Sequence, residues 1–243
     1  MNIQNRYAIV TGASRGLGAS ISGVLAEAGA IVFGLGRSAE DLTSLKEKIG
    51  ESFRPVVCDV RSSDSVNRAM EQVFAQSGGQ IDVLINNAGL GKFGAIEQMA
   101  EEDWEVQVDT NLKGVFLCTK AVVPRMKRQN AKSGFGGHII NIASVAGLVG
   151  NPKIGIYNAT KFGLRGFSES LMLELRNDGI KVTCVYPGSI ETAFFNNTGF
   201  PSGSNHKMHP NEIAQTILHL LQTHDNYLIS EIVLRPLRPK GVM

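Results

Sequence analysis

The sequence has few of the features that mark membrane, secreted or nucleic-acid-binding proteins. No apolar run approaches the length of a membrane-spanning helix, and residues 1–6 lack the apolar core of a signal peptide. The formal net charge is only +2, which is too weak to indicate nucleic acid or a membrane surface as a partner. The three cysteines, Cys58, Cys118 and Cys184, are widely spaced in apolar contexts, so we expect reduced core thiols and a cytoplasmic location.

A metal site is not expected either. His206 and His209, with His219 and His224 further along the chain, have no cysteine or carboxylate cluster beside them.

Apolar runs typical of strands buried on both faces alternate with helical patterns along the whole chain. The strand patterns cover 6–11, 30–36, 54–59, 81–86, 137–144, 181–186 and 227–234, and the helical patterns cover 19–29, 39–50, 62–77, 101–129, 157–177 and 211–223. Interruptions of the helix 101–129 are expected near Thr110 and at Pro124. This order predicts one α/β domain over residues 1–243. Its doubly wound parallel sheet would have about seven strands, with helices on both faces as in a Rossmann fold.

A glycine-rich turn joins the first predicted strand to the first predicted helix. It runs Thr11-Gly-Ala-Ser-Arg-Gly-Leu-Gly18, with the spacing Gly-x-x-x-Gly-x-Gly. Glycines allow a close approach to the backbone, and the helix N-terminus offers unpaired N–H groups to an anion. Ordinary turns also use glycine, but the position between strand and helix favours the pyrophosphate of a dinucleotide.

The second predicted strand ends Leu35-Gly-Arg-Ser38, without the carboxylate that usually holds the adenosine ribose of NAD. Arg37, together with Arg15 of the glycine turn, offers two guanidinium groups to a 2′-phosphate instead. Two solvated surface arginines are the alternative. The pattern favours NADP(H) as the cofactor.

Ser144 follows the fifth predicted strand, and Tyr157 and Lys161 lie four residues apart on one face of the next helix. A free tyrosine titrates near pH ~10, and an adjacent ammonium is expected to lower the pKa of the phenol toward neutrality. These three groups suit proton exchange with a carbonyl or alcohol oxygen. A tyrosine–lysine pair at this spacing also arises by chance, so the motif alone leaves both interpretations open.

Together these motifs resemble the short-chain dehydrogenase/reductase family across nearly the whole chain. The matching residues are Thr11 to Gly18, Asp59, Asn86-Asn-Ala-Gly89, Asn111, Ser144, Tyr157 with Lys161, and Pro187-Gly188 followed by Thr192. The resemblance implies an NADPH-dependent oxidoreductase that transfers hydride between the nicotinamide and a small carbonyl or secondary alcohol substrate.

The resemblance also implies a role for each catalytic residue. Tyr157 would be the acid/base and Ser144 would orient the substrate oxygen. Asn111 would position a water in a proton relay through Lys161, which would also bind the nicotinamide ribose.

The cofactor contacts follow in the same way. Asp59 and Val60 would hold the adenine, Asn86 and Ala88 would lie along the adenosine, and Thr192 would meet the carboxamide. The full predicted set is Gly12, Ser14, Arg15, Gly16, Leu17, Gly18, Arg37, Ser38, Asp59, Val60, Asn86, Ala88, Gly89, Tyr157, Lys161, Pro187, Gly188, Ile190 and Thr192.

Residues 188–209 are expected to form a substrate lid, in which Phe194, Phe195 and Phe200 give an apolar inner surface or simply pack the loop. The resemblance further suggests a homo-oligomer, a tetramer or dimer, in which helices 101–129 and 157–177 pair across subunits. The apolar stripe of Phe167, Leu171 and Leu175 is equally well explained by core burial.

The substrate is left open by two departures from the 3-oxoacyl-carrier-protein reductases. The chain lacks their Gly-Gly close, and residues 91–94 and 231–243 look more like sepiapterin-reductase-type and general carbonyl-reducing members. Pterin, diketone and aldehyde substrates therefore compete with 3-oxoacyl substrates. A non-enzymatic NADP-binding sensor on the same fold is a further alternative, against which the intact proton-transfer set argues. A sugar-nucleotide epimerase or dehydratase would need more residues after the sixth strand.

Overall fold

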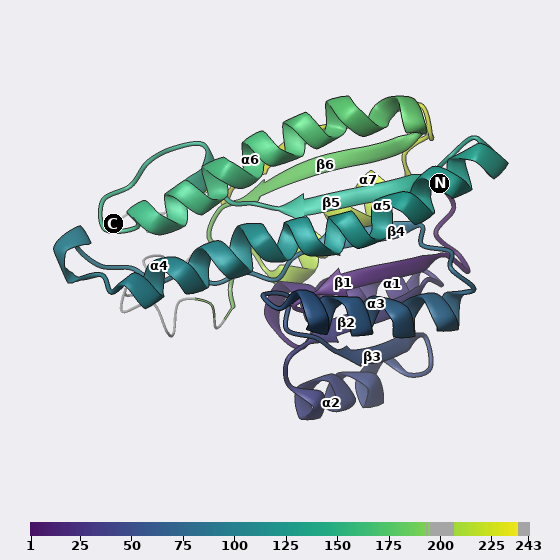
Figure 1. Cartoon of the computed structure of the whole chain (residues 1–243), viewed down its shortest axis with the longest axis horizontal. Helices are drawn as coiled ribbons and strands as arrows, with labels where there is room; N and C mark the ends of the chain where they lie inside the picture. Colours follow the sequence, from purple (N-terminus) through teal and green to yellow (C-terminus); the bar gives the residue numbers. More distant parts are fainter. Residues whose placement is uncertain (193, 195–206, 238–243) are drawn as a thin grey trace.

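Seven parallel strands form one sheet in the order β3-β2-β1-β4-β5-β6-β7 in the computed structural model of the chain, which describes residues 1–192, 194 and 207–237 (Figure 1). The predicted α/β architecture is thereby confirmed. The strands are β1 (Tyr7–Thr11), β2 (Ile31–Gly36), β3 (Phe53–Val57), β4 (Val83–Asn86), β5 (Gly137–Ile142), β6 (Ile180–Pro187) and β7 (Glu231–Leu234).

Helices cover both faces of this sheet (Figure 1). The α-helices are α1 (Gly16–Glu27), α2 (Ala39–Ile49), α3 (Ser63–Ser77), α4 (Glu101–Val108), α5 (Gly114–Ser133), α6 (Gly155–Leu175) and α7 (Pro210–Gln222). A π-helix, η2 (Asp109–Lys113), joins α4 to α5, and short 3₁₀ turns occupy η1 (Ile96–Gln98), η3 (Val145–Gly147) and η4 (Arg176–Asp178). Among the helices that the structure describes, none is long and apolar enough to cross a membrane.

Two apolar cores lie on opposite sides of the sheet. Neighbouring residues of β1 point alternately into them: Ala8 and Val10 pack with side chains of α1, α2 and α7, whereas Ile9 packs with side chains of α3, α5 and α6. Ala8, Ile9 and Val10 are all fully buried. This explains why the middle of the strand is apolar at consecutive positions rather than at alternate ones.

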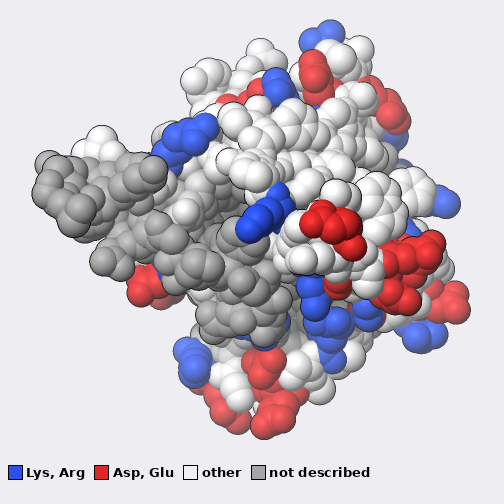
Figure 2. Space-filling view, turned by 90° about the vertical axis from the view of Figure 1, so that its left-hand side faces the viewer, with Lys and Arg blue, Asp and Glu red and all other residues white. Residues whose placement is uncertain are grey.

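The carboxyl ends of the strands form the edge on which the predicted site residues gather. β1 pairs with β2 on one side and with β4 on the other, so the connections leaving β1 and β4 diverge at that edge, which is where folds of this kind bind their ligands. The edge lies at the left of Figure 1, and Figure 2 looks directly onto it. Lysine and arginine side chains occur there alongside acidic ones, without a field of a single sign.

The helical segment predicted at 101–129 is interrupted differently in the structure than was expected from the sequence. Near Thr110 the chain forms the π-helix η2, with one extra residue in the turn, and does not break. Pro124 lies inside α5 without ending it, and the helix continues to Ser133. Pro124 is exposed, so water can satisfy the carbonyl that its missing N–H leaves unpaired.

Other boundaries differ by a few residues. α1 begins at Gly16 rather than at Ala19, which places Gly16 and Gly18 in its first turn. β7 spans Glu231–Leu234, although an apolar run from Tyr227 was expected to pair. The residues before β7 instead hold Lys181, whose ammonium donates to the carbonyl oxygens of His224 at 2.6 Å and Tyr227 at 2.8 Å.

Candidate functional site

The turn between β1 and α1 is shaped by its glycines. Gly12 and Gly16 have φ values of +65° and +56°, which side chains rarely adopt. A Cβ atom on Gly18 would lie 2.2 Å from the carbonyl oxygen of Gly12, so only glycine fits there. No side chain caps α1, and its first turn has no acidic residue. Its first N–H groups are therefore left for an anion such as a pyrophosphate.

The Asn86–Gly89 motif is tied to this turn through Asn87, which sequence reasoning had not singled out. The Thr11 hydroxyl accepts from the backbone N–H groups of Asn87 and Ala88, both at 2.9 Å, and Asn87 Nδ2 donates to the Thr11 carbonyl at 2.9 Å. A Cβ on Gly12 would lie 2.9 Å from the Ala88 Cα. Ala88 therefore lies against the glycine turn, where a bound cofactor would pass.

The Asn86 side chain points into the protein. Its Nδ2 donates to Asn141 Oδ1 at 2.8 Å and to Thr119 Oγ1 at 3.2 Å, and Asn141 Nδ2 donates to Ser168 Oγ at 2.9 Å. All four residues are buried. This chain links β4, β5, α5 and α6, so any contact of Asn86 with a cofactor would come from its backbone.

The predicted adenosine-binding residues lie where β2 and β3 end. Arg37 is exposed, and Ser38 accepts a hydrogen bond from Asp41 N at 3.1 Å as the N-cap of α2. The Asp59 carboxylate is engaged by Arg61, which sequence reasoning missed; the shortest contact, Nη2 to Oδ2, is 2.6 Å. Val60 packs on α5, where a Cβ on Gly114 would lie 2.8 Å from Val60 Cγ2.

Ser144 and Lys161 meet at the end of β5. Ser144 lies two residues beyond the strand, and its Oγ accepts from Ala146 N at 3.1 Å. Lys161 Nζ donates to the carbonyl of Ile142, the last residue of β5, at 2.9 Å. The same Nζ lies 5.6 Å from the ring centroid of Tyr157, one turn earlier on α6. The structure thus brings the three predicted catalytic groups together.

Asn111 joins this group from the π-helix. Its Nδ2 donates to the Leu90 carbonyl at 2.9 Å and to Thr160 Oγ1 at 3.0 Å, and its Oδ1 accepts from Leu90 N at 2.9 Å. A Cβ on Gly89 would lie 3.3 Å from Asn111 Oδ1 and 3.7 Å from Lys161 Nζ. The glycine therefore keeps open the space between the two side chains.

Aromatic rings cover the phenol of Tyr157. The Phe93 ring meets it edge-on at a centroid distance of 5.5 Å, and the Phe194 ring lies at 5.8 Å. Tyr157 is consequently only 9% exposed. The expected contact of a lid phenylalanine with the site therefore holds for Phe194; Phe195 and Phe200 lie outside the described residues.

Burial dominates the electrostatics of the catalytic pair. It raises the pKa of Tyr157 to about 12, although a hydrogen bond with Ser144 opposes this rise. It lowers the pKa of Lys161 to about 8. The sequence-based expectation that Lys161 would lower the pKa of the phenol is therefore wrong for this closed arrangement, because withdrawal from water outweighs the nearby ammonium.

The segment after β6 closes over the glycine turn. Gly188 N donates to the Leu234 carbonyl at 2.7 Å, which fixes the exit of the chain from Pro187. Ile190 forms a bridge to Met208, so the two ends of the predicted lid lie side by side. Thr192 Cγ2 lies 3.4 Å from the place that a Cβ on Gly16 would occupy. Residues 193 and 195–206 of the lid are not among the described ones.

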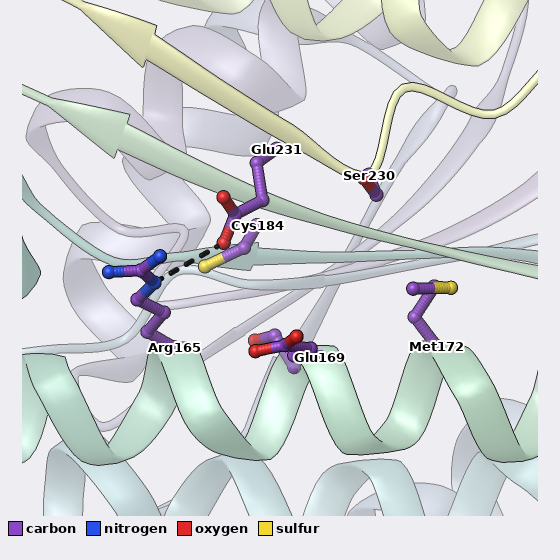
Figure 3. A pocket seen from close by; sticks show the side chains of 7 residues that line it. Arg165, Glu169, Met172, Cys184, Ser230 and Glu231 are labelled. Carbon is purple, nitrogen blue, oxygen red and sulfur yellow. Dashed lines mark ion pairs between the residues drawn. The ribbon is translucent and has the colours of Figure 1, made fainter.

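A cavity of about 160 Å³ lies elsewhere, between α6 and the strands β6 and β7 (Figure 3). An ion pair of 3.5 Å joins Arg165 Nε to Glu231 across it, and Cys184 lies beside this pair. Glu231 also accepts from Tyr186 Oη at 2.5 Å. None of the predicted site residues lines this cavity. Within residues 1–192, 194 and 207–237 no cluster of three metal-ligating side chains occurs, and His209 caps α7.

Known proteins with similar sequences include two named reductases. A 3-ketodihydrosphingosine reductase of Bacteroides thetaiotaomicron is 42% identical over 195 residues, which cover 80% of this chain and 68% of that protein. A 3-oxoacyl-[acyl-carrier-protein] reductase of Thermotoga maritima is 34% identical and covers 96% of this chain and 97% of its own length.

Solved structures show the same fold with nicotinamide cofactors bound. A 3-ketoacyl-(acyl-carrier-protein) reductase from Brucella melitensis, complexed with NADH, superposes with a TM-score of 0.89 at 26% identity, covering 96% of this chain and 97% of that one. A serine dehydrogenase complexed with NADP⁺ gives a TM-score of 0.88 at 30% identity, with 94% of each chain covered. The sequence model described as short chain dehydrogenase matches residues 6–201. The chain therefore belongs to the short-chain dehydrogenase/reductase family of oxidoreductases.

Proposed function

We propose that this protein is an NADPH-dependent oxidoreductase that reduces a carbonyl group to a secondary alcohol, with Tyr157 as the acid/base. The observation that carries the proposal is the convergence of Ser144, Tyr157 and Lys161 at the carboxyl end of β5. The glycine turn fits the cofactor, since the positive φ of Gly12 and Gly16 and the uncapped start of α1 form a cradle for a pyrophosphate.

When bound, the nicotinamide supplies the hydride. Tyr157 donates its phenolic proton to the carbonyl oxygen as that oxygen gains negative charge, and Ser144 donates a hydrogen bond to the same oxygen. Lys161, with a pKa of about 8, stays charged at neutral pH and stabilises the phenolate that Tyr157 leaves behind. A phenol whose pKa is raised to about 12 keeps its proton at neutral pH, so Tyr157 is in the protonated form that a donor needs.

Asn111 completes the set as a positioning group. Its amide is fixed by Leu90 and Thr160, and it lies beside Lys161 across the space kept open by Gly89. In this position it would hold a water between itself and Lys161, through which Tyr157 regains its proton from solvent.

The positive charges of Arg15 and Arg37 support the proposed preference for NADPH. Arg37 at the end of β2 and Arg15 at the start of α1 are both exposed at the carboxyl edge, and β2 ends without a carboxylate that would repel a 2′-phosphate. The three free, buried cysteines are in keeping with a reducing cytoplasmic location.

A 3-oxo compound is the substrate class we favour. Two of the similar proteins are by name a 3-ketodihydrosphingosine reductase and a 3-oxoacyl reductase. The rings of Phe93 and Phe194 offer an apolar surface beside Tyr157 for the part of the substrate next to the carbonyl. Pterins, diketones and aldehydes are the competing substrates.

The test compares the protein with its Tyr157→Phe variant. We expect oxidation of NADPH by an acetoacetyl thioester at neutral pH, measured by the loss of absorbance at the nicotinamide band. The variant lacks only the proton donor, so turnover should fall by roughly 10³-fold or more while NADPH binding stays within about threefold. Binding is measured by NADPH fluorescence.

Three outcomes separate the alternatives. An active Tyr157→Phe variant would show that another group supplies the proton. NADPH binding without turnover on the thioester, followed by turnover on a pterin, diketone or aldehyde, would change the substrate and keep the mechanism. Binding without turnover on any of them would favour a non-enzymatic NADP sensor.

A further inference from the structure

The turn after β3 holds an acid–base pair, in which Asp59 was expected to hold the adenine and Arg61 has been given no role. Arg61 binds Asp59 through Nε, at 2.9 Å to Oδ1 and 3.1 Å to Oδ2, and through Nη2 at 2.6 Å to Oδ2. The backbone N–H of Arg61 also donates to Oδ1 at 3.0 Å. Both carboxylate oxygens are therefore occupied by one residue, two positions along the chain. The side chains of Asp59 and Arg61 are 31% and 35% exposed, so the pair lies at the carboxyl edge of the sheet rather than in the core.

Arg37 lies at the neighbouring strand end. β2 and β3 pair up to Gly36 and Val57, and Cys58 N donates to the Gly36 carbonyl at 2.8 Å. The residues that follow, Arg37 and Asp59, thus leave adjacent strands at the same edge. Hydrogen bonds with Arg61 lower the pKa of Asp59, and Arg37 adds to this lowering from further away. No hydrogen bond or ion pair joins Arg37 to any residue of the described ranges.

The glycine turn lies next to the ends of β2 and β3, where Arg37 and Asp59 are found. A Cβ on Gly36 would lie 3.4 Å from the Cβ of Ser14, so Ser14 sits directly beside the end of β2. Arg15 follows it and is exposed. Ser14, Arg15 and Arg37 therefore border one small region, and the Asp59 carboxylate lies at the neighbouring strand end.

An unpaired Asp59 would oppose a phosphate in this region in two ways. Its charge would repel the phosphate directly, and its oxygens would be free to bind Arg37. The bidentate contact with Arg61 prevents both, because it neutralises the carboxylate and fills its acceptor positions.

We infer that Arg61 is a specificity-determining residue, which holds Asp59 so that Arg37 is left to bind the 2′-phosphate of an adenine dinucleotide. The ligand class is thus an adenosine carrying a 2′-phosphomonoester. The inference rests on the proposed NADPH preference. It adds Arg61 as a residue that acts through Asp59 and does not touch the cofactor.

The experiment measures binding without catalysis. Isothermal titration calorimetry with adenosine 2′,5′-bisphosphate and with 5′-AMP gives a ratio of dissociation constants that reports the 2′-phosphate alone. We expect Arg61→Ala to weaken the bisphosphate roughly tenfold and 5′-AMP by less than about threefold. Arg37→Ala should weaken the bisphosphate at least as much.

Two further variants make the test specific. Arg68→Ala removes the same charge from an exposed position on α3, and we expect the ratio to remain that of the parent protein. In the Arg61→Ala background, Asp59→Asn removes the uncompensated charge and should restore the ratio to within about threefold of the parent value. Thermal melts of all variants confirm folding.

The result that overturns the inference is an unchanged ratio in Arg61→Ala, or a change that Asp59→Asn fails to reverse. Either would leave the proposed function intact if the parent protein still prefers the bisphosphate. A parent protein that binds both nucleotides equally would instead contradict the NADPH preference itself. The two failures are therefore distinguishable in one set of titrations.

Discussion

Lys161 carries its charge in one of the least hydrated positions of the molecule. The side chain is 4% exposed, and the ammonium has one carbonyl acceptor, that of Ile142. Burial lowers its pKa from an ordinary value of 10.5 to about 8, so at pH 7 the protein still holds a charge that water would solvate better. The proposed chemistry thus has a cost in stability.

We predict that Lys161→Met abolishes turnover yet stabilises the fold. At pH 7 the free energy of unfolding should rise by about 1 kcal/mol, because an apolar side chain of similar length replaces a poorly solvated charge. For a chain of this size, 1 kcal/mol corresponds to about 2–4 °C in the melting temperature. Urea unfolding at pH 7 measures the difference.

The advantage of the variant should shrink with pH. Between about pH 8 and pH 10.5 the folded protein loses the proton of Lys161 before the unfolded chain does, so the parent protein gains stability across that window. Repeating the unfolding at pH 9.5 tests the sign. A destabilised variant at pH 7 would show that the hydrogen bond to Ile142 outweighs the desolvation.

Single residues also mark the limits of sequence reasoning. The Tyr157–Lys161 pair, Ser144 and Asn111 could be found because helical spacing and motif order are local features of the chain. The rise in the pKa of Tyr157 could not, because it depends on burial in the folded chain, and the Phe93 and Phe194 rings that contact the phenol come from segments far away in the sequence. The ion pair of Arg61 with Asp59 could have been predicted, because the two opposite charges are only two residues apart in the sequence.

Among the elements, α1 has a sequence that is tightly constrained by a neighbour. Its first turn crosses the end of β1 so closely that a Cβ on Gly18 would meet the Gly12 carbonyl oxygen at 2.2 Å and Asn87 Nδ2 at 2.6 Å. Five residues further along the helix, a Cβ on Gly23 would meet nothing within 4 Å. Gly18 and Gly23 of the same helix therefore differ in whether they can accept a side chain.

We predict opposite effects for alanine at these two positions. Gly18→Ala forces the backbone to shift and should cost about 2–3 kcal/mol of stability, together with most of the NADPH affinity. Gly23→Ala removes the conformational freedom of a helical glycine without a clash and should gain about 0.5–1 kcal/mol. Thermal melts and NADPH fluorescence measure both, and equal effects would contradict the assigned geometry.

The elements themselves were largely predictable. Each predicted helix and strand has a counterpart, because continuous apolar runs, glycine punctuation and serine caps such as Ser38 and Ser62 act over short distances. The π-helix at Asp109–Lys113 was expected as an interruption but not in its form, since its extra residue serves the placement of Asn111 against Leu90 and Thr160.

At the scale of the whole molecule, α5 and α6 present apolar side chains to solvent. Phe116 on α5 is 47% exposed and Phe162 on α6 is 43% exposed. The π-helix η2 that precedes α5 touches α6, since a Cβ on Gly163 would lie 3.3 Å from a methyl group of Leu112, one turn before Phe116. Such a patch is typical of an interface. The expected homo-oligomer would use this face.

We predict a dimer or tetramer in solution by light scattering coupled to size-exclusion chromatography. Phe116→Glu with Phe162→Glu should shift the protein toward a smaller species, because two charges would be buried in the contact. Val57→Glu, at a position 58% exposed on β3, is the matched control and should leave the assembly unchanged. A monomeric mass for the parent protein in this measurement would contradict the expected homo-oligomer.

The order of the sheet also separates two tasks along the chain. The glycine turn and the residues after β2 and β3, which face the adenosine end, fall within residues 11–61, whereas Asn111, Ser144, Tyr157 and Lys161 come from the strands and helices beyond β4. The proposed roles therefore place cofactor choice and proton chemistry on different stretches of polypeptide. We predict that a chimera in which residues 1–61 come from a relative takes the relative's nucleotide preference and keeps the substrate of this protein.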